Sequence, residues 1–96
     1  MAELTLLDAG IVTYLASLPK PTTNEEAKAV GAQFVSWVRS RTTALDLPWP
    51  EDDWFALGEA WDINLYLDMD DKPAATLFPV VDGKTRTDVF LSVKVA

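Results

Sequence analysis

The spacing of apolar residues changes once along this chain, within the tryptophan-rich segment 45–62. Before that segment, apolar residues recur every three or four positions, which is the period of an amphipathic helix. After it, apolar and polar residues alternate, which is the period of a half-buried strand. The sequence therefore predicts helices first and strands second, which is the order of an α+β fold.

Two helices are predicted ahead of this segment. The first covers about residues 5–18 and ends before Pro19, because a residue that precedes proline is pushed out of the helical conformation. Its apolar stripe consists of Leu4, Leu7, Ile11, Tyr14, Leu15 and Leu18. The second helix covers about residues 24–45, and Thr23 or Asn24 can cap its first amides. This longer helix is expected to be the central packing element.

A short helical connector and three strands are predicted for the second half. The connector covers residues 51–58, because three acids follow Pro50 and Gly58 can end a helical turn. The strands form a three-stranded antiparallel meander over residues 61–69, 75–81 and 89–95, with a hairpin turn at Asp82-Gly83. Pro79 predicts an irregularity or a sheet edge, because it has no amide to donate. The whole chain, residues 1–96, is expected to be one two-layer domain with the helices on one sheet face.

Composition favours a small globular protein of the cytoplasm. Hydrophobic residues make up 49% and charged residues 24% of the 96 positions, which suits a packed domain rather than a disordered chain. The apolar runs are too short for a membrane span. The first ten residues carry acids where a secretory signal would carry bases.

The residue types also limit the chemistry. The chain has no histidine and no cysteine, which removes the usual nucleophile triads and zinc sites, and its glycines form no phosphate-binding loop. Carboxylates lie beside tryptophans, as in sugar-cleaving sites, but we favour a structural role because a small domain has little room for a substrate cleft. Asp68, Asp70 and Asp71 lack the glycine and glutamate of a calcium loop, which favours a solvated turn. We expect no enzyme activity, no cofactor and no metal.

Charge is the strongest asymmetry in the sequence. The net charge is −7, and nine of the fifteen acids lie between Arg41 and Lys72, where there is no base. Tyr66 is expected on the polar face of its strand, where aromatic residues can anchor a protein contact. The predicted partner-binding residues are Asp52, Asp53, Trp54, Glu59, Asp62, Tyr66, Asp68, Asp70 and Asp71. The alternatives are carboxylates that only keep loops solvated, and a surface that mimics nucleic acid.

The leading hypothesis is a non-enzymatic protein-binding module that blocks a basic surface on a partner, as an inhibitor, immunity or anti-defence protein does. The acidic charge argues against direct binding to nucleic acid or to an anionic membrane. The alternative is a structural or assembly subunit of a larger complex such as a viral particle. In that case the edge of the C-terminal strand would pair with another copy of the chain.

Overall fold

The computed structural model describes residues 6–95, and the side chains of residues 8–95. Both predicted helices are present: α1 is Leu6–Ser17 and α2 is Asn24–Ala44. Outside this part lie Leu4 of the predicted stripe, Thr5, where the first helix was expected to begin, and the side chain of Leu7. Within residues 6–95, neither helix has the length and apolarity that crossing a lipid bilayer requires.

The start of α2 is fixed by side chains that bind its free amides. Thr23 is the N-cap, and its hydroxyl accepts a hydrogen bond from the backbone amide of Glu26 at 3.1 Å. The Glu26 carboxylate in turn accepts from the backbone amide of Thr22 at 2.9 Å and from the Thr22 hydroxyl at 2.8 Å. Both bonds lower the pKa of Glu26, and the bond from the backbone amide has the larger effect. The predicted cap is therefore confirmed.

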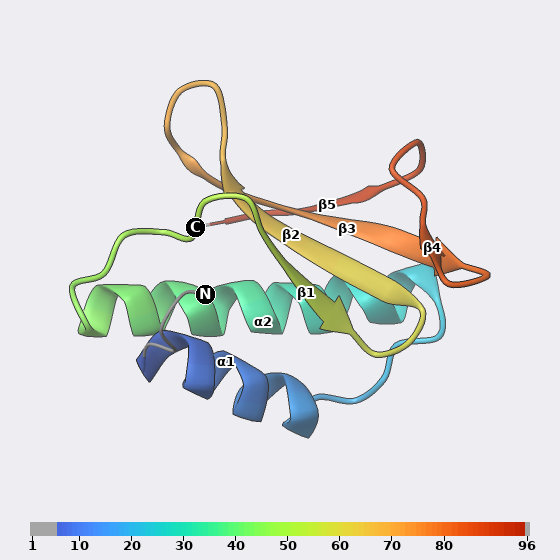
Figure 1. The fold of residues 1–96 in the computed structure, drawn as a ribbon, viewed down its shortest axis with the longest axis horizontal. Helices are drawn as coiled ribbons and strands as arrows, with labels where there is room; N and C mark the ends of the chain where they lie inside the picture. Colours follow the sequence, from blue (N-terminus) through green and yellow to red (C-terminus); the bar gives the residue numbers. More distant parts are fainter. Residues whose placement is uncertain (1–5, 96) are drawn as a thin grey trace.

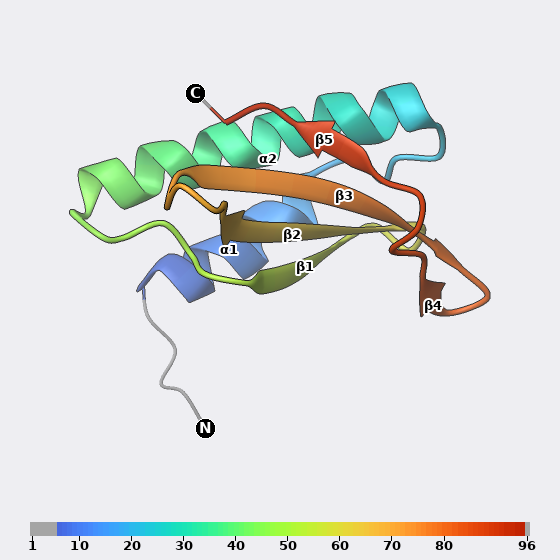
Figure 2. The same ribbon diagram turned by 90° about the horizontal axis from the view of Figure 1, so that it is seen from above.

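The sheet is antiparallel and curled into a half-barrel against α2. Within residues 6–95 it has five strands: β1 Asp53–Leu57, β2 Trp61–Leu67, β3 Pro73–Val81, β4 Lys84–Thr85 and β5 Leu91–Val93. Neighbouring strands follow the order β1-β2-β3-β4, and β5 also pairs with β3. Figures 1 and 2 show the helices on one face of the sheet only. This is the expected two-layer α+β fold, with two strands more than the predicted meander.

The predicted helical connector is wrong, because residues 53–57 form strand β1. Asp53 pairs with Leu65 and Leu57 with Trp61, so this strand occupies one edge of the sheet. Phe55 and Leu57 turn toward the core, and pairing with β2 outweighs the local preference of three acids after Pro50 for a helix start. Gly58, at φ +74°, belongs to the turn between β1 and β2 instead of ending a helix.

Pro79 was predicted to cause an irregularity or a sheet edge, and the irregularity observed is a change of partner on one side of β3. β5 pairs with β3 as far as Leu77, and β4 begins opposite Val80, so the proline lies between the two pairings. Asp82 and Gly83 have φ of +52° and +74° and make the expected tight turn to β4. Residues 86–90 leave the sheet between β4 and β5, so the last strand is shorter than the predicted segment 89–95.

The core lies between α2 and the inner face of the sheet, which is the face toward the helices. Its fully covered members include Phe34 and Val38 of α2, Ile63 and Leu65 of β2, and Leu77 of β3. Gly31 lets α2 approach closely: a Cβ there would lie 2.9 Å from both terminal carbons of Leu77. α1 covers the remaining side through Ile11 and through Tyr14, whose ring stacks on Trp37 at 4.4 Å.

Candidate functional site

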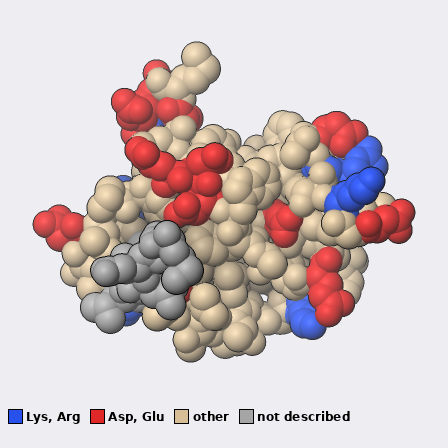
Figure 3. Space-filling view, in the orientation of Figure 1, with Lys and Arg blue, Asp and Glu red and all other residues tan. Residues whose placement is uncertain are grey.

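The fold gathers six carboxylates at one end of the sheet, where β1 begins and the β2–β3 turn lies. We call this group the acidic end, and it comprises Glu51, Asp52, Asp53, Asp68, Asp70 and Asp71. Antiparallel pairing places Asp53 beside Leu65, two residues before the end of β2, so the two acidic segments come together. All six residues are exposed, and Figure 3 shows acidic side chains gathered over this region.

Asp68 builds the β2–β3 turn with its own side chain. Its Oδ1 accepts hydrogen bonds from the backbone amides of Lys72 at 3.0 Å and of Asp70 at 2.8 Å. Both amides lower the pKa of Asp68, and the amide of Lys72 has the larger effect. Asp71 adopts the left-handed conformation at φ +57°, which aspartate tolerates better than most residues. Asp68 is thus committed to the turn, whereas Asp70 and Asp71 remain available to a partner.

Asp52 and Asp53 are positioned by Asn64 of β2. The Asn64 side-chain amide donates to the backbone oxygen of Asp53 at 3.2 Å and to Oδ1 of Asp52 at 3.4 Å. Asp52 also adopts the left-handed conformation, at φ +52°. Partial burial, followed by the charges of Asp8 and Asp52, raises the pKa of Asp53. This carboxylate would therefore be stabilised by a cation.

Exposed aromatic rings lie on the outer face of the sheet, which is the face away from the helices. Trp54 of β1 contacts Phe78 of β3 with ring centroids 5.1 Å apart, and Phe78 contacts Phe90 at 6.1 Å. Trp54 is 46% exposed and Phe90 is 55% exposed. Tyr66 is half-buried on the same face, and its hydroxyl shares a 3.0 Å hydrogen bond with Thr76. We call Trp54, Tyr66, Phe78 and Phe90 the aromatic face.

The acidic end and the aromatic face meet at a shallow hollow of about 420 Å³. It is lined by Glu51, Asp52, Asn64, Tyr66, Leu67 and Asp71. Its carboxylates belong to the acidic end, and Tyr66 belongs to the aromatic face. The two groups therefore form one continuous candidate binding surface, and the polar centre of that surface is held in place by Asn64.

Two predicted site residues lie apart from this surface. The β1–β2 hairpin reverses the chain, so Glu59 and Asp62 fall toward the opposite end of the sheet. Glu59 pairs with Lys20 at 3.4 Å, and Asp62 accepts a hydrogen bond from the Thr85 hydroxyl at 2.6 Å. The other seven predicted residues belong to the acidic end or to the aromatic face.

Phe78 and Asn64 were not predicted as site residues. Successive side chains of a strand point to opposite faces, and this alternation places both residues on the outer face. Phe78 follows the core residue Leu77, and Asn64 lies between Ile63 and Leu65. The surface offers carboxylates, amide groups and apolar rings. Among residues 6–95 no group of three or more acidic side chains is arranged to hold a metal ion.

Comparison of the chain with protein-family models, with curated proteins and with solved structures gives no match.

Proposed function

We propose that this chain is a non-enzymatic protein-binding module that docks on a basic surface of another protein. In this proposal it blocks that surface, as an inhibitor, immunity or anti-defence protein does. The observation that carries the proposal is the run of contacting rings Trp54, Phe78 and Phe90 on the sheet face opposite α1 and α2. Large exposed apolar patches with a polar rim are typical of interaction sites.

The two parts of the surface would contribute differently to binding. Tryptophan and other aromatic residues supply most of the affinity in protein interfaces, because each buries a large area at a small cost in side-chain entropy. Carboxylates at the rim mainly steer the partner and select for basic surfaces. The aromatic face is therefore assigned the role of anchor, and the acidic end the roles of steering and selectivity.

The partner is a protein rather than a nucleic acid or a membrane, and the site of action is the cytoplasm. The net charge of −7 disfavours contact with phosphate groups, which attract Lys and Arg. The same charge keeps such a chain in solution and favours encounter with a basic protein.

The test is capture of partners by the tagged chain from the lysate of its native cells, followed by mass spectrometry. The test variants are Trp54→Ala and the double variant Asp52→Asn/Asp71→Asn. The matched control is Asp46→Asn/Asp82→Asn, because all four aspartates have positive φ, between +52° and +57°, and the change in net charge is the same. Asparagine tolerates that backbone conformation, so the variants differ mainly in position.

We expect one stoichiometric partner with the wild-type chain and with the control. It should be lost with Trp54→Ala and reduced with Asp52→Asn/Asp71→Asn or at high salt. Equal retention by all variants would contradict the proposed surface. Capture that depends on Trp54 but not on the two aspartates would remove the electrostatic part alone.

The alternative, a structural or assembly subunit, is favoured by the edges of the sheet. In the described part of the chain β5 pairs with β3 alone, so a strand of a second copy could add beside it. Light scattering of the purified chain separates the two proposals. A mass of several subunits, lost when Ser92 is replaced by proline, would favour the assembly subunit, and a monomer at high concentration would favour the binding module.

A further inference from the structure

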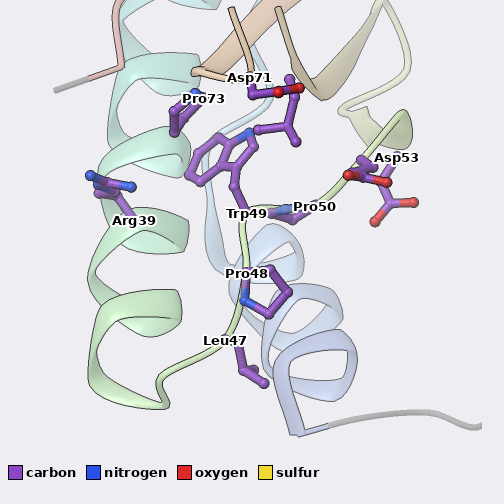
Figure 4. A pocket seen from close by; sticks show the side chains of 10 residues that line it. Arg39, Leu47, Pro48, Trp49, Pro50, Asp53, Asp71 and Pro73 are labelled. Atoms are coloured by element: carbon purple, nitrogen blue, oxygen red, sulfur yellow. The ribbon is translucent and has the colours of Figure 1, made fainter.

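A second cavity lies on the helix side of the acidic end, under the β2–β3 turn. Its volume is about 730 Å³, within the usual range for sites that bind small molecules or single side chains. The segment between α2 and β1 forms one wall, and the residues around the β2–β3 turn form another (Figure 4). The lining residues are Arg39, Leu47, Pro48, Trp49, Pro50, Glu51, Asp53, Leu67, Asp71 and Pro73.

Most of the wall is apolar. The indole of Trp49 lies in the middle of it, flanked by Pro48 and Pro50, and Pro73 closes it from the hairpin side (Figure 4). Trp49 is only 6% exposed, and its indole nitrogen has no hydrogen-bond partner among residues 6–95. A buried donor without an acceptor is costly, and a backbone carbonyl group of a bound partner would satisfy it. The nitrogen itself is covered, so such an acceptor reaches it only when neighbouring side chains shift.

The charged groups are unevenly distributed around the apolar wall. Arg39 projects from α2 on one side of Trp49, and Asp53 lies on the other side at the start of β1 (Figure 4). Glu51 and Asp71 add two more carboxylates to the lining. Three acids against one base leave the cavity negative on the side away from α2. Partial burial and the nearby charges of Asp8 and Asp52 already disfavour the ionised form of Asp53.

We propose that this cavity binds an arginine side chain of the protein partner, which gives the acidic end its selectivity for a basic surface. The inference rests on the proposed binding function and adds to it the residue type that enters the pocket. The aliphatic stem of arginine would cross Trp49 and the prolines, and its guanidinium would reach Asp53 and Glu51. The positive charge of Arg39 repels the guanidinium from the α2 side of the cavity. The arginine side chain therefore enters with its guanidinium toward the acids.

Arginine suits this pocket better than lysine for two reasons. Its planar guanidinium has five donors and binds carboxylates in pairs, whereas the lysine ammonium is a compact and strongly hydrated charge. The guanidinium also stacks on aromatic faces, of which tryptophan is the best. An apolar side chain would fill the pocket but would leave the repulsion between Asp53 and its acidic neighbours unrelieved.

The test is an NMR titration of the ¹⁵N-labelled chain of 96 residues with N-acetyl-arginine N-methylamide. The same measurement with the blocked citrulline derivative, which has nearly the same shape and no charge, isolates the charge. We expect saturable shifts of the Trp49 indole signal and of residues 47–53 and 67–73, with a Kd of about 1–10 mM for this single side chain. Blocked citrulline should bind at least about fivefold more weakly.

Two variants give opposite signs and so keep the test independent of folding. Asp53→Asn should weaken arginine binding about fivefold, and Arg39→Gln should tighten it about twofold to threefold. Neither variant should change the binding of blocked citrulline. The dispersion of the amide spectrum verifies that each variant is folded.

Absence of saturation up to about 50 mM, which is well above the expected Kd, would overturn the pocket assignment. Equal shifts with arginine and citrulline would make this an apolar pocket, and equal affinity for blocked lysine would remove the preference for arginine. Shifts confined to the aromatic face would place the contact elsewhere. The proposed function is tested separately, since partner capture that depends on Trp54 would stand even if blocked arginine did not bind.

Discussion

The two faces of the sheet are built from alternate residues of the same strands, yet their chemistry is opposite. The inner face presents aliphatic side chains such as Ile63, Leu65 and Leu77, which are fully buried in the core. The outer face presents aromatic and polar side chains such as Trp54, and Phe90 packs against it from the segment between β4 and β5. Both rings remain about half exposed. Asn64 and Thr76 are buried on that face, at 7% and 5% exposure, although no helix of residues 6–95 covers it.

This difference separates residues that hold the fold together from residues that are available to a partner. Burial of aliphatic groups against a helix supplies folding energy in proportion to area. Rings that contact one another across the strands while facing water add less to stability and retain surface for binding. Substitutions on the inner face should therefore change the free energy of unfolding, and those on the outer face should change affinity.

The sharpest form of the comparison uses two adjacent residues of β3, Leu77 and Phe78. Leu77→Ala should lower the free energy of unfolding by about 3 kcal/mol, because it leaves a cavity beneath α2. Phe78→Ala should cost about 1 kcal/mol, since it mainly removes contacts with Trp54 and Phe90. Urea unfolding followed by circular dichroism measures both. A cost for Phe78→Ala as large as that for Leu77→Ala would mean that the outer face is a second core.

A smaller effect is expected from the glycine that lets α2 approach the sheet. In most helices Gly→Ala stabilises by up to about 1 kcal/mol. Gly31→Ala should instead destabilise by about 1–2 kcal/mol, because its Cβ would lie 2.9 Å from the Leu77 side chain within a closed core. Gly10→Ala is the control: the added Cβ meets the Trp37 and Arg41 side chains at 3.3 and 3.4 Å, outside the sheet core. We expect Gly10→Ala to be close to neutral in the same urea experiment, and stabilisation by Gly31→Ala would contradict the tight approach of α2.

Much of the fold that supports the inner face could be predicted from sequence, because helix bounds, caps and turns are encoded by local sequence patterns. The predicted helix over residues 24–45 matches Asn24–Ala44, and the cap at Thr23 is confirmed. The two-residue turn at Asp82-Gly83 and the change of partner at Pro79 also follow from local backbone chemistry. In each case neighbouring residues alone determine the outcome.

The candidate site was less predictable, because it depends on which strands pair. Residues 53–57 follow a proline and acids that resemble a helix start, and only pairing with β2 makes them a strand. The resulting hairpin carries Glu59 away from Asp52 and brings Asp71 toward it. Proximity in sequence was therefore a poor guide to proximity in space for the acidic residues.

The smallest expected effect concerns two aspartates of the acidic end whose pKa values shift in opposite directions. The pKa of Asp53 is raised by partial burial and by Asp8 and Asp52, so its charged form destabilises the fold at neutral pH. Asp53→Asn should therefore stabilise the chain at pH 7, by about 0.5 kcal/mol or less for so exposed a group. As the pH falls through the raised pKa of Asp53 toward the pKa of an unfolded aspartate, about 3.9, Asp53 becomes neutral. The free energy of unfolding of the wild type should then approach that of Asp53→Asn.

Asp68→Asn is the control of opposite sign. The pKa of Asp68 is lowered by the amides of Lys72 and Asp70, so its charge stabilises the turn above the unfolded pKa, and this contribution is lost as the pH falls through the lowered pKa. Thermal unfolding of both variants and the wild type from pH 7 to pH 3 distinguishes the two roles. If Asp53→Asn proved as destabilising as Asp68→Asn at pH 7, Asp53 would be a structural residue. Stabilisation by Asp53→Asn with loss of arginine binding would instead mean that this carboxylate serves a partner at a cost to the fold.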